Sequence, residues 1–131
     1  MSALHGRVDE AVECCLRGCG AHWRRVASGE WGISAEACDW PLHIGLARRG
    51  GLLRAQAEVL AAGVADPVAL LQRNRALTLV RFGSTAAGAV WIAGEIPERA
   101  ATDVAEIDRL LALLVSSADA ARGAYATRRR N

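Results

Sequence analysis

The feature that most constrains the fold is a pair of alternating segments on either side of Gly50-Gly51. Apolar residues occupy every second position of both segments, which is the pattern of strands with one apolar and one polar face. Adjacent glycines supply the positive φ angles that a two-residue hairpin turn requires. We therefore predict a β-hairpin with strands over residues 41–48 and 53–59. Its apolar face would carry Leu42, Ile44, Leu46, Leu53, Ala55, Ala57 and Val59.

The N-terminal segment has the spacing of an amphipathic helix. Apolar residues recur at helical intervals from Leu4 to Cys19, with charged residues on the other side. Gly18 and Gly20 favour an end near that point, because glycine readily adopts the left-handed conformation of a helix terminus. We predict a helix over about residues 3–19.

Two further helices are predicted by their start signals. Asp66-Pro67 combines an N-cap oxygen with a proline that has no N–H to leave unpaired, so a short helix is expected from Val68 to about Arg75. A wide apolar stripe marks the last helix, with Thr102 or Asp103 as its cap and an end near residue 122. Its stripe comprises Val104, Ile107, Leu110, Leu111, Leu114, Val115 and Ala118.

The remaining segments are predicted to complete an antiparallel sheet. Residues 23–33 alternate loosely and form one or two short strands, and residues 77–82 form another. A turn over residues 83–88 leads to a partner strand over 89–96, which Pro97 ends because it has no N–H to donate. The expected fold is α+β, with helices packed on an antiparallel sheet in the order α-β-β-β-α-β-β-α. Residues 1–131 form a single domain, with about 124–131 as a frayed basic tail.

Charge and hydropathy exclude several classes of partner. The net charge is +2, all 16 basic residues are arginine, and three of these stand together at positions 128–130. Without those three the remainder has a charge of −1, which offers no electrostatic footprint for nucleic acid. No apolar run reaches the ~20 residues of a membrane span, and the N-terminus does not have the pattern of a signal peptide. We expect a protein of the bacterial cytosol.

Metal binding is the first chemical alternative that the sequence raises. Cys15, Cys19 and His22 would share one helix face, and Cys38 could add a fourth zinc ligand. However, the usual C-x-x-C spacing is absent, and glycines interrupt the helix that would align the three. Buried cysteine is common in protein cores, so we expect structural burial and no metal.

Catalytic motifs are also absent from the sequence. The histidines are His5, His22 and His43, and no serine lies in a G-x-S-x-G elbow, although a Cys–His pair stays open as an alternative. Residues 83–88 lack the lysine of a phosphate-binding loop and precede a strand. The acidic pairs are interpreted as residues that stabilise a helix start: Glu95 with Glu98 and Asp103 with Glu106. We expect no enzyme activity, no catalytic residue and no cofactor.

Four of the six aromatic residues are tryptophan, namely Trp23, Trp31, Trp40 and Trp91. Ordinary core packing is one interpretation. The other is that some of them are anchors at a protein interface, where tryptophan is enriched.

Two stretches give the chain a family resemblance. LLQRNRALTLVRFG (residues 70–83) and GAVWIAGEIP (residues 88–97), followed by a leucine-rich helix, resemble the C-terminal half of class I (CesT/Tir-type) type III secretion chaperones. The same residues are similar to the related YbjN-like domains. The motif resemblance covers residues 70–97, and the expected element order extends it over nearly the whole chain.

The resemblance implies a homodimeric chaperone, without cofactor or ATP, that holds an extended segment of a virulence effector in the bacterial cytosol. The segment would cover apolar patches and add strands to a sheet edge. Such chaperones tend to be acidic, whereas this chain has a pI near 8.5. A YbjN-like regulatory or scaffold role is therefore the alternative.

The resemblance also implies two sets of site residues, each of which could equally belong to the core. The dimer interface would use Val68, Leu71, Leu77, Leu79 and Trp91. The effector segment would bind Leu4, Val8, Trp31, Leu42, Ile44 and Leu46.

Overall fold

The structure, a computed structural model, describes the backbone of residues 3–130 and the side chains as far as Tyr125. Three α-helices and six strands alternate along the chain, with two short 3-10 helices between them. Their bounds are α1 Ala3–Gly18, β1 His22–Ala27, β2 Glu30–Ala37, β3 Trp40–Arg49, β4 Leu52–Leu60, α2 Pro67–Arg73, η1 Asn74–Ala76, β5 Val80–Ser84, β6 Val90–Pro97, η2 Ala100–Thr102 and α3 Val104–Arg130.

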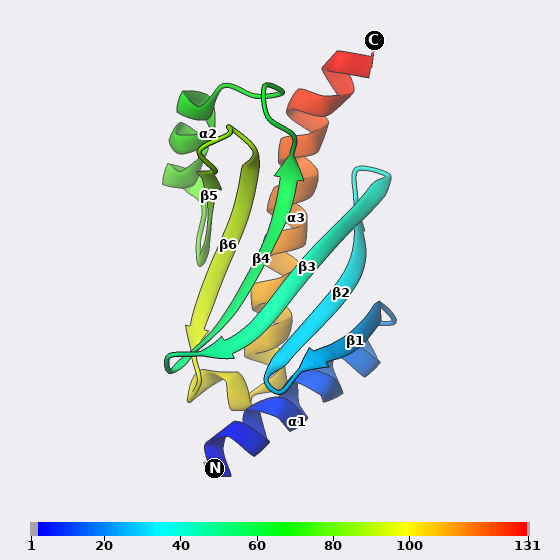
Figure 1. The fold of residues 1–131 in the computed structure, drawn as a ribbon, viewed down its shortest axis with the longest axis vertical. Helices are drawn as coiled ribbons and strands as arrows, with labels where there is room; N and C mark the ends of the chain where they lie inside the picture. Colours follow the sequence, from blue (N-terminus) through cyan, green and yellow to red (C-terminus); the bar gives the residue numbers. More distant parts are fainter. Residues whose placement is uncertain (1–2, 131) are drawn as a thin grey trace.

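The strands form one antiparallel sheet in the order β1-β2-β3-β4-β6-β5 (Figure 1). This confirms the predicted α+β class, the antiparallel sheet and the order of its elements. The segment for which one or two strands were expected forms two, so four strands precede α2. Because β6 inserts between β4 and β5, the edges of the sheet are β1 and β5.

Helices α1 and α3 cover one face of the sheet. In Figure 1, α3 passes behind the strands and α1 lies across the end of the sheet near β1. The apolar stripe of α3 is fully buried at Ile107, Leu110 and Leu114, against strand residues such as Leu53 and Ile92. No helix covers the opposite face within the described residues, and the alternating burial of β3 and β4 reflects this difference.

The hairpin turn predicted at Gly50-Gly51 is confirmed. Gly50 and Gly51 have φ angles of 62° and 79° and join β3 to β4. A second turn of the same kind joins β2 to β3, where Cys38 and Asp39 have φ angles of 54° and 69°. Non-glycine residues seldom adopt this conformation, and so the sequence did not indicate the second turn.

The strand expected over residues 77–82 begins later, at Val80. The preceding Leu79 has a φ of 71°, which takes the backbone out of the extended conformation. The helix before it starts as predicted, because the Asp66 carboxylate accepts a hydrogen bond from the Val68 N–H at 3.0 Å. Asp103 caps α3 in the same way, accepting from the Ala105 N–H at 2.9 Å.

The last helix is longer than predicted and runs to Arg130 rather than ending near Arg122. The residues that extend it are rich in alanine and arginine, which are strong helix formers, and contain no proline. Side chains beyond Tyr125 lie outside the described residues, and so does most of the predicted frayed tail.

Candidate functional site

Most of the residues predicted to bind an effector segment lie in the core. Val8, Trp31, Leu42, Ile44 and Leu46 are at most 3% exposed, and the sixth, Leu4, is half-buried. For the four strand residues of this set, alternation identifies the shared face of the sheet correctly, but α1 and α3 cover that face. As folded, these five side chains have no surface to offer a partner, and the alternative interpretation as core residues describes their place in the protomer.

The residues predicted to form a dimer interface fall into two groups. Val68 and Leu71 on α2 are 58% and 61% exposed, beside an apolar hollow of about 70 Å³ between α2 and β5. Leu77, Leu79 and Trp91 are half-buried. Trp91 lies on the opposite face of the sheet from the buried Ile92, so it does not join the α2 patch.

The tryptophans also divide between the two interpretations. Trp31 is a core residue, since only 1% of it is exposed and its indole N–H is hydrogen-bonded. Trp23, Trp40 and Trp91 are each half-buried. Core packing therefore accounts for one tryptophan fully and for the others in part.

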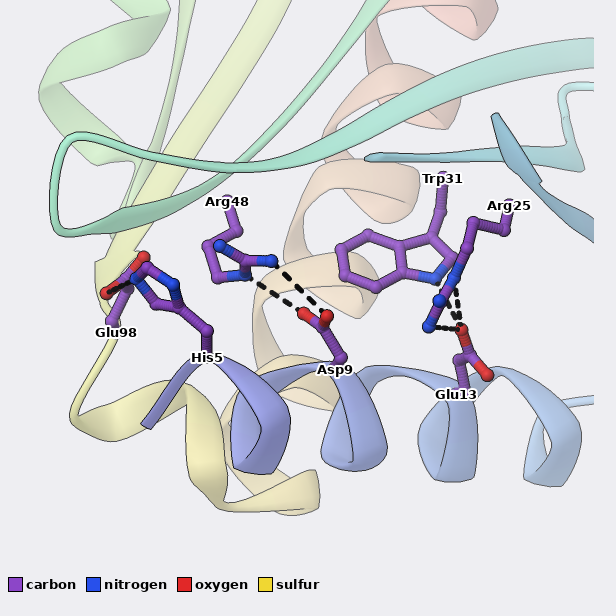
Figure 2. A network of polar contacts seen from close by, with 7 residues as sticks. All are labelled: His5, Asp9, Glu13, Arg25, Trp31, Arg48 and Glu98. Atoms are coloured by element: carbon purple, nitrogen blue, oxygen red, sulfur yellow. Dashed lines mark hydrogen bonds and ion pairs between the residues drawn. The ribbon is translucent and has the colours of Figure 1, made fainter. Parts of the chain in front are cut away.

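A row of polar side chains attaches α1 to the sheet (Figure 2). His5, Asp9 and Glu13 are spaced four residues apart and so share one face of the helix. The Asp9 carboxylate accepts hydrogen bonds from Arg48 of β3 at 2.9 and 3.3 Å, and His5 Nε2 lies 3.5 Å from Glu98 Oε2. Together with Glu13, these contacts fix the helix over the buried face.

Glu13 makes the densest set of contacts in this row. Its Oε2 accepts hydrogen bonds from the Trp31 indole N–H at 3.0 Å and from the Arg25 guanidinium. The Trp31 hydrogen bond has the largest effect and lowers the pKa of Glu13; desolvation, the next largest, opposes it, and Arg25 adds to the lowering. Similarly, the hydrogen bond to Asp9 raises the pKa of Arg48. Both groups are thus held in their charged forms.

Arg122 forms a second attachment, at the other end of the sheet. Only 4% of it is exposed, and its guanidinium donates to the carbonyls of Val59, Ala37 and Trp40 at 2.9–3.1 Å. It also lies 4.4 Å from the centre of the Trp40 ring. Desolvation lowers the pKa of Arg122, a cost that the three carbonyls offset. The contact is structural, because it ties α3 to the ends of three strands.

The residues considered for metal or thiol chemistry do not converge. Within the described part of the chain, no group of three or more histidine, cysteine or acidic side chains is placed to hold a metal ion. Cys15 is buried, and desolvation raises the pKa of its thiol to about 11, which keeps it protonated at neutral pH. His43 lies exposed on the open face.

One edge of the sheet is closed by a side chain. The Asn74 amide donates to the Phe82 carbonyl at 3.0 Å and accepts from the Phe82 N–H at 2.7 Å. These groups of β5 face away from β6, so Asn74 occupies the position that an added strand would take. At the other edge, no described strand lies beyond β1.

The uncovered face of the sheet carries a shallow trough. We define the trough by two adjoining hollows of about 410 and 480 Å³ on β1 to β4, which share Gly32 and Gly45. These glycines are paired across β2 and β3, and the row continues to Arg24 on β1 and Gln56 on β4. The polar or small side chains around them are His22, Ser34, His43, Ala47, Arg49 and Arg54.

Charge on this face is mostly neutralised in pairs. Glu95 Oε1 lies 3.2 Å from Arg81 and its Oε2 3.6 Å from Arg54, and Glu30 pairs with Arg49 at 2.9 Å. Glu95 therefore belongs to the open face. The sequence had suggested that it stabilises a helix start, and this interpretation was wrong. The Arg24 side chain makes no hydrogen bond or ion pair to any residue that the structure describes.

Comparison with known proteins adds no family to this description, because neither a family model nor a curated protein matches the chain. Among the described helices, none combines the length and apolar character needed to cross a membrane.

Sequence reasoning missed three features of the surface, and two of them had a visible signal. The four-residue spacing of His5, Asp9 and Glu13 could have indicated a helix face that contacts polar partners. Gly32 and Gly45 are glycines inside strands, which often mark the close approach of another molecule. The closure of β5 by Asn74 has no sequence signal, because it depends on the path of the chain through η1.

Proposed function

We propose that this protein is a non-enzymatic chaperone of the bacterial cytosol that binds an extended segment of a type III secretion effector and keeps it competent for secretion. It acts as a homodimer and needs no cofactor. The observation that carries the proposal is the uncovered face of the six-stranded sheet, a broad surface of small and polar side chains with no helix over it. The resemblance of residues 70–97 to secretion chaperones supports the same assignment.

The α2 patch supports the homodimer. Val68 and Leu71 expose more than half of their surface on a seven-residue helix, next to an apolar hollow lined by Pro67 and Phe82. Large apolar side chains exposed together favour burial against a partner, since each releases roughly 1.5–3 kcal/mol when fully buried. A second copy would bring the same patch and give a symmetric contact.

The function is tested by purifying the tagged protein from its native host and identifying what copurifies by mass spectrometry. The identified partner is then co-expressed with the protein, and the complex is analysed by light scattering and limited proteolysis. We expect a defined complex of two chaperone copies with one partner, in which a segment of the partner is protected. A protein that stays monomeric at micromolar concentration and protects no co-expressed neighbour would contradict the proposal.

The dimer is tested separately by Leu71→Asp, which places a charge in the proposed interface. We expect the dimer dissociation constant to rise at least tenfold in sedimentation experiments, because burying an unpaired carboxylate is costly. Gln72→Asp is the matched control, since Gln72 is also exposed on α2. Equal dimerisation of Leu71→Asp and the native chain would exclude this surface.

A YbjN-like regulatory or scaffold protein is the second candidate, and the mildly basic pI of 8.5 favours it. The two are separated by the partner that copurifies. A secreted effector supports the chaperone, whereas a resident cytosolic protein whose activity changes on binding supports the regulator.

A further inference from the structure

We propose that the trough on the open face binds an acidic polypeptide segment, whose backbone lies against Gly32 and Gly45. This inference rests on the proposed protein-binding function and adds the place and the chemistry of the bound segment. It is carried by two observations, the glycine floor and the unpaired positive charge beside it.

The glycine floor has no explanation inside the protomer. Glycine within a strand costs about 0.5–1 kcal/mol relative to alanine, so it persists where the structure requires it. Neither Gly32 nor Gly45 has a positive φ. A Cβ on Gly45 would meet only the Gln56 carbonyl at 4.0 Å, and one on Gly32 would meet Val26 at 3.5 Å, both ordinary contacts. Side chains would fit, and they would fill the trough.

The dimensions of the trough suit a short stretch of extended chain. The row from Arg24 through Gly32 and Gly45 to Gln56 crosses four strands. Three spacings of ~4.8 Å give about 14 Å, the length of roughly four residues of extended polypeptide. Val26, 58% exposed, and Leu52 supply apolar contacts at the sides, so that a peptide gains more there than a small anion would.

The charge of the trough selects an acidic segment. The hollow that contains Arg24 is also lined by His22 and His43 and by no carboxylate. In the adjoining hollow, Arg49 is paired with Glu30 and Arg54 with Glu95, so the free positive charge of the trough is that of Arg24. The Arg24 side chain extends over the floor, with Nε 4.0 Å from the position of a Cβ on Gly32. A carboxylate of the bound segment would give Arg24 the partner that it lacks within the described chain.

The probe for this proposal is a displayed library of random 12-residue peptides, selected on the immobilised full-length protein. We expect Asp and Glu to be enriched over Lys and Arg in the selected pool. The most enriched peptide is then synthesised with a fluorophore, and its dissociation constant is measured by anisotropy. A selected pool without acidic enrichment would overturn the proposal.

Two substitutions locate the peptide. Gly45→Val, which fills the floor, and Arg24→Glu, which reverses the free charge, should each weaken binding at least tenfold. Gly123→Val and Arg109→Glu are the controls: Gly123 is an exposed glycine of α3 with free space around it, and Arg109 is exposed on α3 behind the sheet. Both controls should bind as the native chain does.

Other outcomes identify other occupants and would overturn the proposal. Competition by tripolyphosphate at equal charge concentration would indicate a simple anion site. A change in oligomeric state of Gly45→Val would indicate that a second copy occupies the trough. If Gly45→Val fails to fold, the glycine serves sheet curvature, and Arg24→Glu alone then decides whether the acidic peptide binds there.

Failure of this proposal and failure of the proposed function give different results. If a native partner binds Gly45→Val and Arg24→Glu as tightly as the native protein, the protein-binding function stands and the trough is not its site. If no native partner binds any form of the protein, the function itself is wrong.

Discussion

The two faces of the sheet contain glycine for different reasons. On the covered face, a Cβ on Gly94 would lie 2.7 Å from the Leu79 carbonyl oxygen and 3.0 Å from Leu110, so the packing of the protomer excludes a side chain. On the open face, Gly32 and Gly45 have room for one. The covered face therefore contains glycine because of neighbours already present. The packing of the protomer does not require glycine at Gly32 or Gly45, which is why we relate these two positions to a molecule bound in the trough.

Gly94→Val gives the largest effect expected from this comparison. Its Cβ alone would come within 3.0 Å of a backbone oxygen and two core side chains, and we expect the free energy of unfolding to fall by about 3 kcal/mol. Urea denaturation followed by circular dichroism measures the change. A decrease of less than about 1 kcal/mol in the free energy of unfolding would mean that the covered face adapts easily and that its packing does not require glycine at position 94.

Acid should weaken the polar contacts that hold α1 against the sheet. Contacts in the folded state lower the pKa of Glu13, so its stabilisation is complete above the unfolded value of about 4.3 and is lost as the pH falls through the folded pKa. Glu13→Gln should cost about 1 kcal/mol at pH 7. Below pH 4 the difference between the two proteins should shrink, as measured by urea denaturation. A pH-independent difference would contradict the role of this charge.

Gly45→Val should have the smallest effect on stability, and the opposite sign. A β-branched residue suits an exposed strand position better than glycine does, so we expect the free energy of unfolding to rise by about 0.5 kcal/mol. Thermal and urea denaturation should agree. Destabilisation as large as that of Gly94→Val would remove the contrast between the faces and the reason to assign the open glycines to a ligand.

The fold could be predicted from the sequence where a residue type has one strong local conformational preference. Gly50-Gly51 indicates a hairpin turn because glycine adopts positive φ at little cost, and Asp66-Pro67 indicates a helix start. Cys38-Asp39 forms the same kind of turn with residues that rarely adopt it, and so it was missed. Its geometry depends on distant contacts, including the hydrogen bond from the Cys38 N–H to Asp119 on α3.

The candidate site was harder to predict than the fold. Alternation separates the two faces of a strand but does not say which face a helix will cover. Leu42, Ile44 and Leu46 were accordingly assigned to a partner, although α1 and α3 bury them. The open face has little apolar character, and its signal lies in the absence of side chains at two glycines. Hydrophobic patterning does not detect such a signal.

The closure of β5 by Asn74 limits how copies of this protein can assemble. A sheet with two free edges can add molecules at both ends and grow into a filament, whereas this sheet has only β1 available for pairing. Two copies joined edge to edge through β1 would use up the last free strand of each. Growth by strand addition alone would therefore stop at a pair.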